Sequence, residues 1–175
     1  MNPRLILPVA AFMSLLSGQS YQADSLRQAY MHSLDDAEFA RQWYVELSAS
    51  QPGSGDVLTL GYLGAQLAVL AKHDPLPWRK LQHLRLAEVT VHHALALEPG
   101  HPEIHFLRFS YQHNIPGFLG LSDELDSDRL LLVRYLTSPP DGRIDRQVAG
   151  DMAAFLIDSG RCTPREIQRL RSVFP

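Results

Sequence analysis

Apolar residues recur at helical spacing along most of this 175-residue chain, and no segment keeps up the alternation of apolar and polar residues that marks a β-strand. Phe39, Trp43 and Leu47 stand four positions apart, which places them on one face of a helix. Residues 77–97 carry an apolar stripe formed by Leu84, Ala87, Val91, Ala94 and Leu95. The pattern predicts an all-α protein.

Glycine, proline and Asp/Ser signals divide the chain into about eight helices. Asp35, with Glu38 after it, predicts the start of the second helix, and Ser122 the cap of the sixth. Thr163 opens a capping box. The expected helices cover about residues 25–34, 35–47, 57–72, 77–97, 102–113, 122–136, 144–160 and 163 onward. Joined mostly by short loops, they predict four stacked hairpins.

Two glycines lie inside the predicted helix over residues 57–72. Glycine within a helix costs about 0.5–1 kcal/mol relative to alanine, so Gly61 and Gly64 need a packing reason. We expect another helix to approach closely at these positions.

The first twenty residues have the features of an export signal. Arg4 is followed by an uncharged, mostly apolar run over residues 5–18, too short to cross a bilayer. Gly18 and Ser20 are small residues at the positions that a signal peptidase reads. The sequence predicts a signal peptide over residues 1–20 and a periplasmic or secreted protein over residues 21–175. A buried first helix of a cytosolic protein is the alternative, against which Pro8 argues.

Parts of the chain resemble the tetratricopeptide repeat (TPR). Leu60-x2-Leu63-Gly64-x2-Leu67 is similar to the first half of a repeat, and Ala87-x3-Val91 with Ala94 and Pro99 to the second. Ile104-x2-Leu107-Arg108-x2-Tyr111 resembles the start of the next repeat. Gly64 and Ala87 are 23 positions apart (87 − 64), where a repeat has about 12. We therefore expect a TPR-like domain with about 11 extra residues around positions 73–80.

A second resemblance covers most of residues 21–175. The segments LGYLGAQLAVLAK, ALALEPGHPEIHFLRFSYQHNIPGFLG and SDELDSDRLLLVRYL resemble a group of uncharacterised exported bacterial proteins. This resemblance implies a helical, exported protein and transfers no catalytic residue.

The formal net charge of −3 provides no excess positive field that would attract nucleic acid or an anionic membrane. Cys162 is the only cysteine, which excludes an internal disulfide and a cysteine-based zinc cluster. Residues 21–175 have no second long apolar run, so no membrane span is expected after signal cleavage.

The densest group of polar residues lies on the helix expected over residues 102–113. A guanidinium buried there must be paired, and Glu103, Asp123 and Glu124 are the partners we expect for Arg108. A structural ion pair is favoured over a ligand pocket. The candidate binding residues are Glu103, His105, Arg108, Gln112 and Asn114.

The remaining motifs predict no catalytic, metal or cofactor site. The eight histidines include His92 and His93, which point about 100° apart on a helix and cannot easily share an ion. The acidic run over residues 123–128 lacks the central glycine of a calcium loop and is better explained as helix-start carboxylates. No glycine-rich phosphate loop, HExxH or GxSxG motif occurs.

Two functions remain for the chain. The first is a helical module that binds a protein or peptide in the cell envelope. The second is an enzyme or small-ligand binder with a pocket near Arg108 and His105. A deep, closed pocket beside Arg108 would favour the second, whereas an open groove lined by several hairpins would favour the first.

Overall fold

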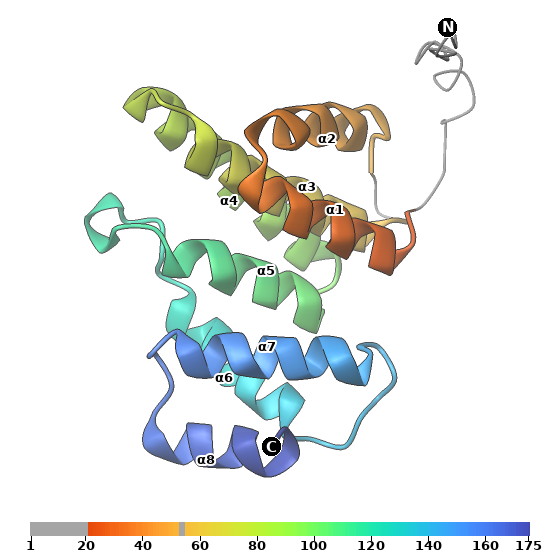
Figure 1. Ribbon diagram of the computed structural model, residues 1–175, viewed down its shortest axis with the longest axis vertical. Helices are drawn as coiled ribbons and strands as arrows, with labels where there is room; N and C mark the ends of the chain where they lie inside the picture. The colour runs from red at the N-terminus through yellow and green to blue at the C-terminus, as the bar shows by residue number, and fades with distance from the viewer. Residues whose placement is uncertain (1–20, 53–54) are drawn as a thin grey trace, which may run out of the picture.

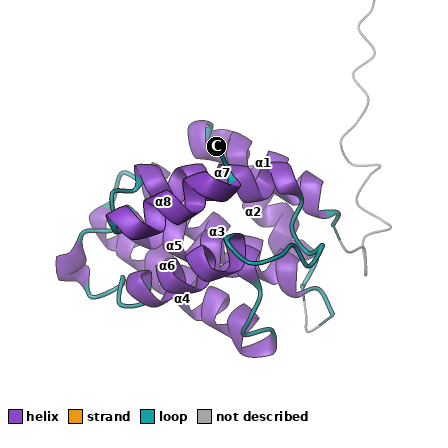
Figure 2. Cartoon of the chain, turned by 90° about the horizontal axis from the view of Figure 1, so that it is seen from below, coloured by secondary structure: helices purple, strands orange, loops and turns teal. Residues whose placement is uncertain are grey.

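The computed structural model describes residues 21–52 and 55–175, and the predicted signal segment 1–20 lies outside these ranges. Every regular element within them is helical, as Figures 1 and 2 show. The elements are α1 (Ala23–Asp35), α2 (Ala37–Ala49), α3 (Val57–His73), α4 (Pro77–Leu97), α5 (Pro102–His113), the short 3-10 helix η2 (Gly117–Leu119), α6 (Leu125–Leu136), α7 (Arg146–Asp158) and α8 (Pro164–Val173). The all-α class and the number of α-helices are confirmed.

The helices α1 to α4 lie together at one end of the long axis of the molecule, α5 lies in the middle, and α6, α7 and α8 form the other end (Figure 1). Successive helices contact each other, and α3 also contacts α1 and α5. No helix in the described ranges is long and apolar enough to cross a membrane. The resemblance to tetratricopeptide repeats stays a prediction.

The two glycines of α3 have the packing role that the sequence predicts. A Cβ atom at Gly61 would lie 2.9 Å from Cγ1 of Ile104 on α5. One at Gly64 would lie 2.5 Å from Cγ2 of Val91 on α4. Because both glycines lack a Cβ atom, α4 and α5 can each approach α3 closely. The helix α3 is buried over most of its length.

Two predicted helix starts are wrong. Asp35 is the last residue of α1, and Asp36 caps α2 by accepting hydrogen bonds from the backbone N–H groups of Glu38 and Phe39. Ser122 does not cap α6, which begins at Leu125. By contrast, the capping box at Thr163 is confirmed, with both of its reciprocal hydrogen bonds present.

The extra residues between Gly64 and Ala87 lengthen two helices. The helix α3 has 17 residues and α4 has 21, and only residues 74–76 connect them. The α3–α4 hairpin therefore extends past α2 in Figure 1.

Candidate functional site

The candidate binding residues on α5 lie on different sides of that helix. Glu103, His105, Arg108 and Gln112 are all buried. Asn114 is exposed, and its amide donates to the backbone oxygen of Ser110 at 2.8 Å. His105 and Arg108 share Asp128 as a partner, whereas Glu103 and Gln112 each have partners of their own, and none of the four lines a described hollow.

Glu103 is the acceptor of the first polar network, which joins α5 to α1 and α3. Arg27 donates from Nε to Oε1 of Glu103 at 2.8 Å and from Nη2 to Oε2 at 2.6 Å. The hydroxyl of Tyr62 donates to Oε1 at 2.6 Å. The hydrogen bonds with Glu103 raise the pKa of Arg27, while burial and then the charge of Glu103 raise the pKa of Tyr62. This carboxylate has its donors within the fold.

Asp128 on α6 is the acceptor of the second network. Arg108 donates from Nε to Oδ2 at 2.8 Å and from Nη2 to Oδ1 at 2.7 Å, a bidentate pair. Burial opposes the charge of Arg108, but the hydrogen bonds and charge of Asp128 raise its pKa. The carboxylate of Asp128 is fully buried. Arg108 is thus paired within the fold, as expected.

The expected partners of Arg108 are wrong, however: the partner is Asp128, inside α6, and Asp123 and Glu124 precede this helix. Leu125, Asp128 and Leu132 lie on one buried face of α6. Asp128 is therefore directed toward α5 and is not a solvent-facing helix-start carboxylate. Glu103 is held by Arg27, and Asp123 is exposed.

His105 lies between two acceptors. Its Nδ1 is 2.7 Å from Oδ1 of Asp128, and its Nε2 is 2.8 Å from the backbone oxygen of Pro99. The backbone oxygen of Pro99 is an acceptor, and both oxygens of Asp128 also accept from Arg108. Both contacts are hydrogen bonds only when the ring is doubly protonated. Both ring nitrogens of His105 are directed at protein atoms and not at a cavity.

Glu124 accepts a hydrogen bond from the amide of Gln112 at 2.8 Å and contacts Nε2 of His92 at 3.2 Å. Burial acts to raise the pKa of Glu124, but the bond from Gln112 and the nearby charge of Arg108 lower it overall. The other ring nitrogen of His92 contacts the backbone oxygen of Glu88, not its carboxylate. Throughout the described ranges, no three His, Cys, Asp or Glu side chains are grouped so that they could hold a metal ion.

Cys162 is buried, and burial raises the pKa of its thiol. A raised pKa leaves less of the reactive thiolate at neutral pH. The cysteine packs in the apolar cluster between α6, α7 and α8.

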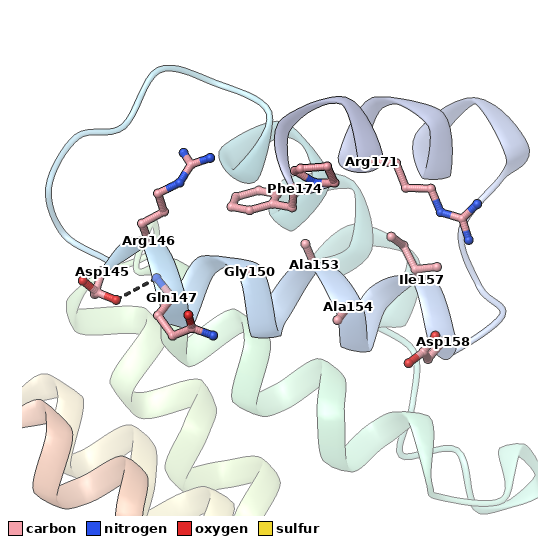
Figure 3. Close-up of a pocket in the computed structure, with 11 residues that line it drawn as sticks. Asp145, Arg146, Gln147, Gly150, Ala153, Ala154, Ile157, Asp158, Arg171 and Phe174 are labelled. Carbon is pink, nitrogen blue, oxygen red and sulfur yellow. Dashed lines mark hydrogen bonds between the residues drawn. The ribbon is translucent and has the colours of Figure 1, made fainter.

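The larger of two described hollows is a groove of about 790 Å³ along α7, beside the end of α8 (Figure 3). Small or apolar side chains of α7 form its floor, and charged side chains occupy its ends. Figure 3 shows Arg146 and Arg171 on either side of Phe174. The lining residues are Asp145, Arg146, Gln147, Gly150, Ala153, Ala154, Ile157, Asp158, Arg171, Phe174 and Pro175.

Phe174 packs over α7 as a partly buried side chain. The guanidinium of Arg146 lies 5.7 Å from the ring centre and donates to the backbone oxygen of Val173 at 3.3 Å. Gly150 lies beneath the ring, and a Cβ atom there would be 3.7 Å from Cδ1 of Phe174. The groove thus has an aromatic wall over a floor of small residues.

A second hollow, of about 430 Å³, lies between α1 and α7. It is lined by Asp24, Arg27, Gln28, Met31, Val148 and Asp151. Gln147 of the first hollow donates to Asp151 of the second at 3.2 Å, so the two adjoin along α7. Neither hollow is lined by Arg108 or His105.

The sequence analysis missed the groove on α7. Gly150, Ala153, Ala154 and Ile157 are spaced as i, i+3, i+4 and i+7, which signals one helical face with little side-chain bulk. That signal was present in the sequence. The position of Phe174 over the face depends on how α8 folds back, which spacing does not show.

Comparisons of this chain with known protein families, curated protein sequences and solved structures find no match.

Proposed function

We propose that this chain is an exported helical-repeat protein that binds a protein or peptide partner in the cell envelope. The observation that carries the proposal is the pair of adjoining hollows on α7, which are lined by the first and last helical hairpins together. A surface shared between hairpins is what helical-repeat proteins offer to extended partners. The apolar residues 5–18 and the small residues after them support export.

The groove favours an amphipathic segment as its ligand. Its small floor residues leave room for apolar side chains beside Phe174, and the ring gives them an aromatic contact. Arg146 and Arg171 at the two sides suit carboxylate groups on the partner. Asp145 and Asp158, also at the groove, suit basic groups on the partner.

The buried residues of α5 support this function over a small-ligand site near Arg108 and His105. A binding or catalytic group needs hydrogen-bonding capacity that is open to the ligand. Arg108, His105 and Glu103 are each directed at protein partners at 2.6–2.8 Å. Their geometry is that of groups that join α5 to α1, α3 and α6.

Site-specific photocrosslinking tests the proposal. A photoreactive residue in place of Ala154, in the groove, should give a discrete protein adduct in intact envelopes. The same residue in place of Leu130, exposed on α6, is the matched control and should give none. Gly150→Trp in the same chain should abolish the adduct from position 154, because the indole fills the groove. An adduct that persists with Gly150→Trp, or none from position 154, would refute the proposal.

A further inference from the structure

The outward face of α4 carries large apolar side chains that no other helix covers. Trp78 is 66% exposed, Leu86 45%, Val89 67% and Leu97 40%. At 100° per residue these four fall within an arc of about 100°. The opposite side of α4 packs on α3 and α5 through Ala87, Val91 and Ala94. Gln82 and His93, also exposed, lie within the same arc, so the face that α4 turns to solvent combines these four apolar side chains with two polar ones.

Two exposed arginines border this face at the first half of α4. Arg79 and Arg85 flank the arc, whereas Lys80, also exposed, lies on the opposite side of the helix. Glu88 is the only carboxylate of the helix. None of the three basic residues takes part in an ion pair with another described residue.

The position of these cations is unfavourable for the helix alone. The N-terminus of a helix carries partial positive charge, which acidic residues and capping side chains normally offset. The first turn of α4 has no acidic residue, and Leu76 at the N-cap makes no side-chain cap. The carboxylate at this end is that of Asp74, which accepts from the backbone N–H of Leu76 at 2.9 Å and lies 3.6 Å from Nε2 of His83. Arg79 and Arg85 form no ion pair with it.

We infer that the outward face of α4 docks on a membrane surface that contains anionic lipids, with α4 lying along the surface. Tryptophan favours the membrane–water interface, apolar side chains enter the boundary of the acyl chains, and arginine and lysine attract anionic headgroups. The α3–α4 hairpin projects past α2, so the face can reach a flat surface (Figure 1). This inference does not depend on the proposed partner in the groove on α7.

The charges favour a lipid surface over a second copy of the chain. The arc from Trp78 to Leu97 contains no carboxylate, so the same face of a second copy would offer no counter-charge to Arg79 and Arg85. Neither described hollow is lined by a residue of α4, so the face offers no described groove to a peptide.

Vesicle binding by the full-length chain tests the inference, with Trp78 as a local probe. The chain has two tryptophans, and Trp43 is only 7% exposed. Vesicles of phosphatidylcholine and phosphatidylglycerol should shift the emission of Trp78 to the blue, and vesicles of phosphatidylcholine alone should not. Trp78→Phe should bind with no shift. Arg79→Gln with Arg85→Gln should weaken binding about tenfold or more, and added salt should weaken it as well.

Matched variants elsewhere separate the face from general effects. Arg134→Gln with Arg165→Gln removes two exposed arginines from α6 and α8 and should leave binding unchanged. Leu130→Ala removes an exposed apolar side chain from α6 and should also leave vesicle binding unchanged, while Val89→Glu should abolish it.

Vesicle binding that leaves the emission of Trp78 unshifted would come from another part of the chain and would overturn the inference. Self-association without vesicles that Val89→Glu abolishes would assign the face to a second copy instead. A blue shift with soluble polyglutamate but not with vesicles would assign it to an acidic protein.

Discussion

The buried charged residues of α5 have a structural role. Arg108 and Asp128 form a bidentate pair, and both are buried. Removing two charges from water is expensive, and the pair regains that cost only while both members are present. The same holds for Arg27 and Glu103 on the other side of α5. At this scale the polar residues of α5 join helices and are not open to a ligand.

Arg108→Met should destabilise the fold strongly. Methionine roughly keeps the volume of the arginine stem, but it leaves the buried carboxylate of Asp128 without its bidentate partner. Breaking a buried pair in this way costs about 3–5 kcal/mol, which urea unfolding would measure. Adding Asp128→Asn should restore part of the loss, whereas adding Asp123→Asn, at an exposed carboxylate, should restore none. Normal stability combined with loss of a ligand would show that Arg108 serves a binding site.

Asp141 should give the fold a stability contribution that is lost in acid. The hydroxyl of Tyr135 donates to Oδ1 at 2.7 Å and Arg143 Nε to Oδ2 at 2.7 Å, which lower the pKa of Asp141 from 3.8 to about 2. Since the folded-state pKa is the lower one, the contribution is present above about pH 4 and disappears as the pH falls to about 2. Urea unfolding of the parent and Asp141→Asn should therefore differ at neutral pH and converge near pH 2. A difference that stays constant over this range would contradict the assignment.

At the scale of elements, spacing predicted the helices well, including the first residues of α3, α4 and α5, but it misplaced the starts of α2 and α6. The bounds of α4 and α5 follow from proline and glycine signals that act within a few residues. The partner of Arg108 was not predicted, although Asp128 lay within the expected helix. An ion pair between helices depends on tertiary packing, which a local pattern does not contain.

Gly64→Leu should lower the melting temperature by several degrees. The first side-chain atom would already lie 2.5 Å from Cγ2 and 3.0 Å from the backbone nitrogen of Val91, so α3 and α4 must separate. Overpacking of this kind costs about 1–3 kcal/mol. Gly100→Ala is the control, since no atom lies within 4 Å of its added carbon. Equal melting temperatures for parent and Gly64→Leu would show that the two helices are not in close contact.

At the scale of the whole molecule, α5 connects two apolar clusters. Phe109 packs with the cluster of α6, α7 and α8, while Ile104 and Tyr111 pack with that of α3 and α4. Both described hollows lie along α7, one beside α8 and the other against α1. No residue of α4 lines either of them. The two proposed contacts, with a partner and with a membrane, therefore use different parts of the chain and allow both at once.

The last prediction is that the exported protein begins at or near Tyr21. The segment before it lies outside the described residues, but the chain immediately after it is part of the fold. The ring of Tyr21 packs edge-on against Trp43 with centroids 5.3 Å apart, and α1 begins at Ala23. Cleavage after Ser20 keeps this contact and all of α1, whereas cleavage after Ala23 would remove both the ring and the first residue of α1. Intact-mass measurement of the protein from envelope fractions would therefore show a chain that starts at Tyr21. A chain that retains Met1 in that fraction would exclude signal cleavage, and a start beyond Ala23 would show that the Tyr21–Trp43 contact is not kept in the exported protein.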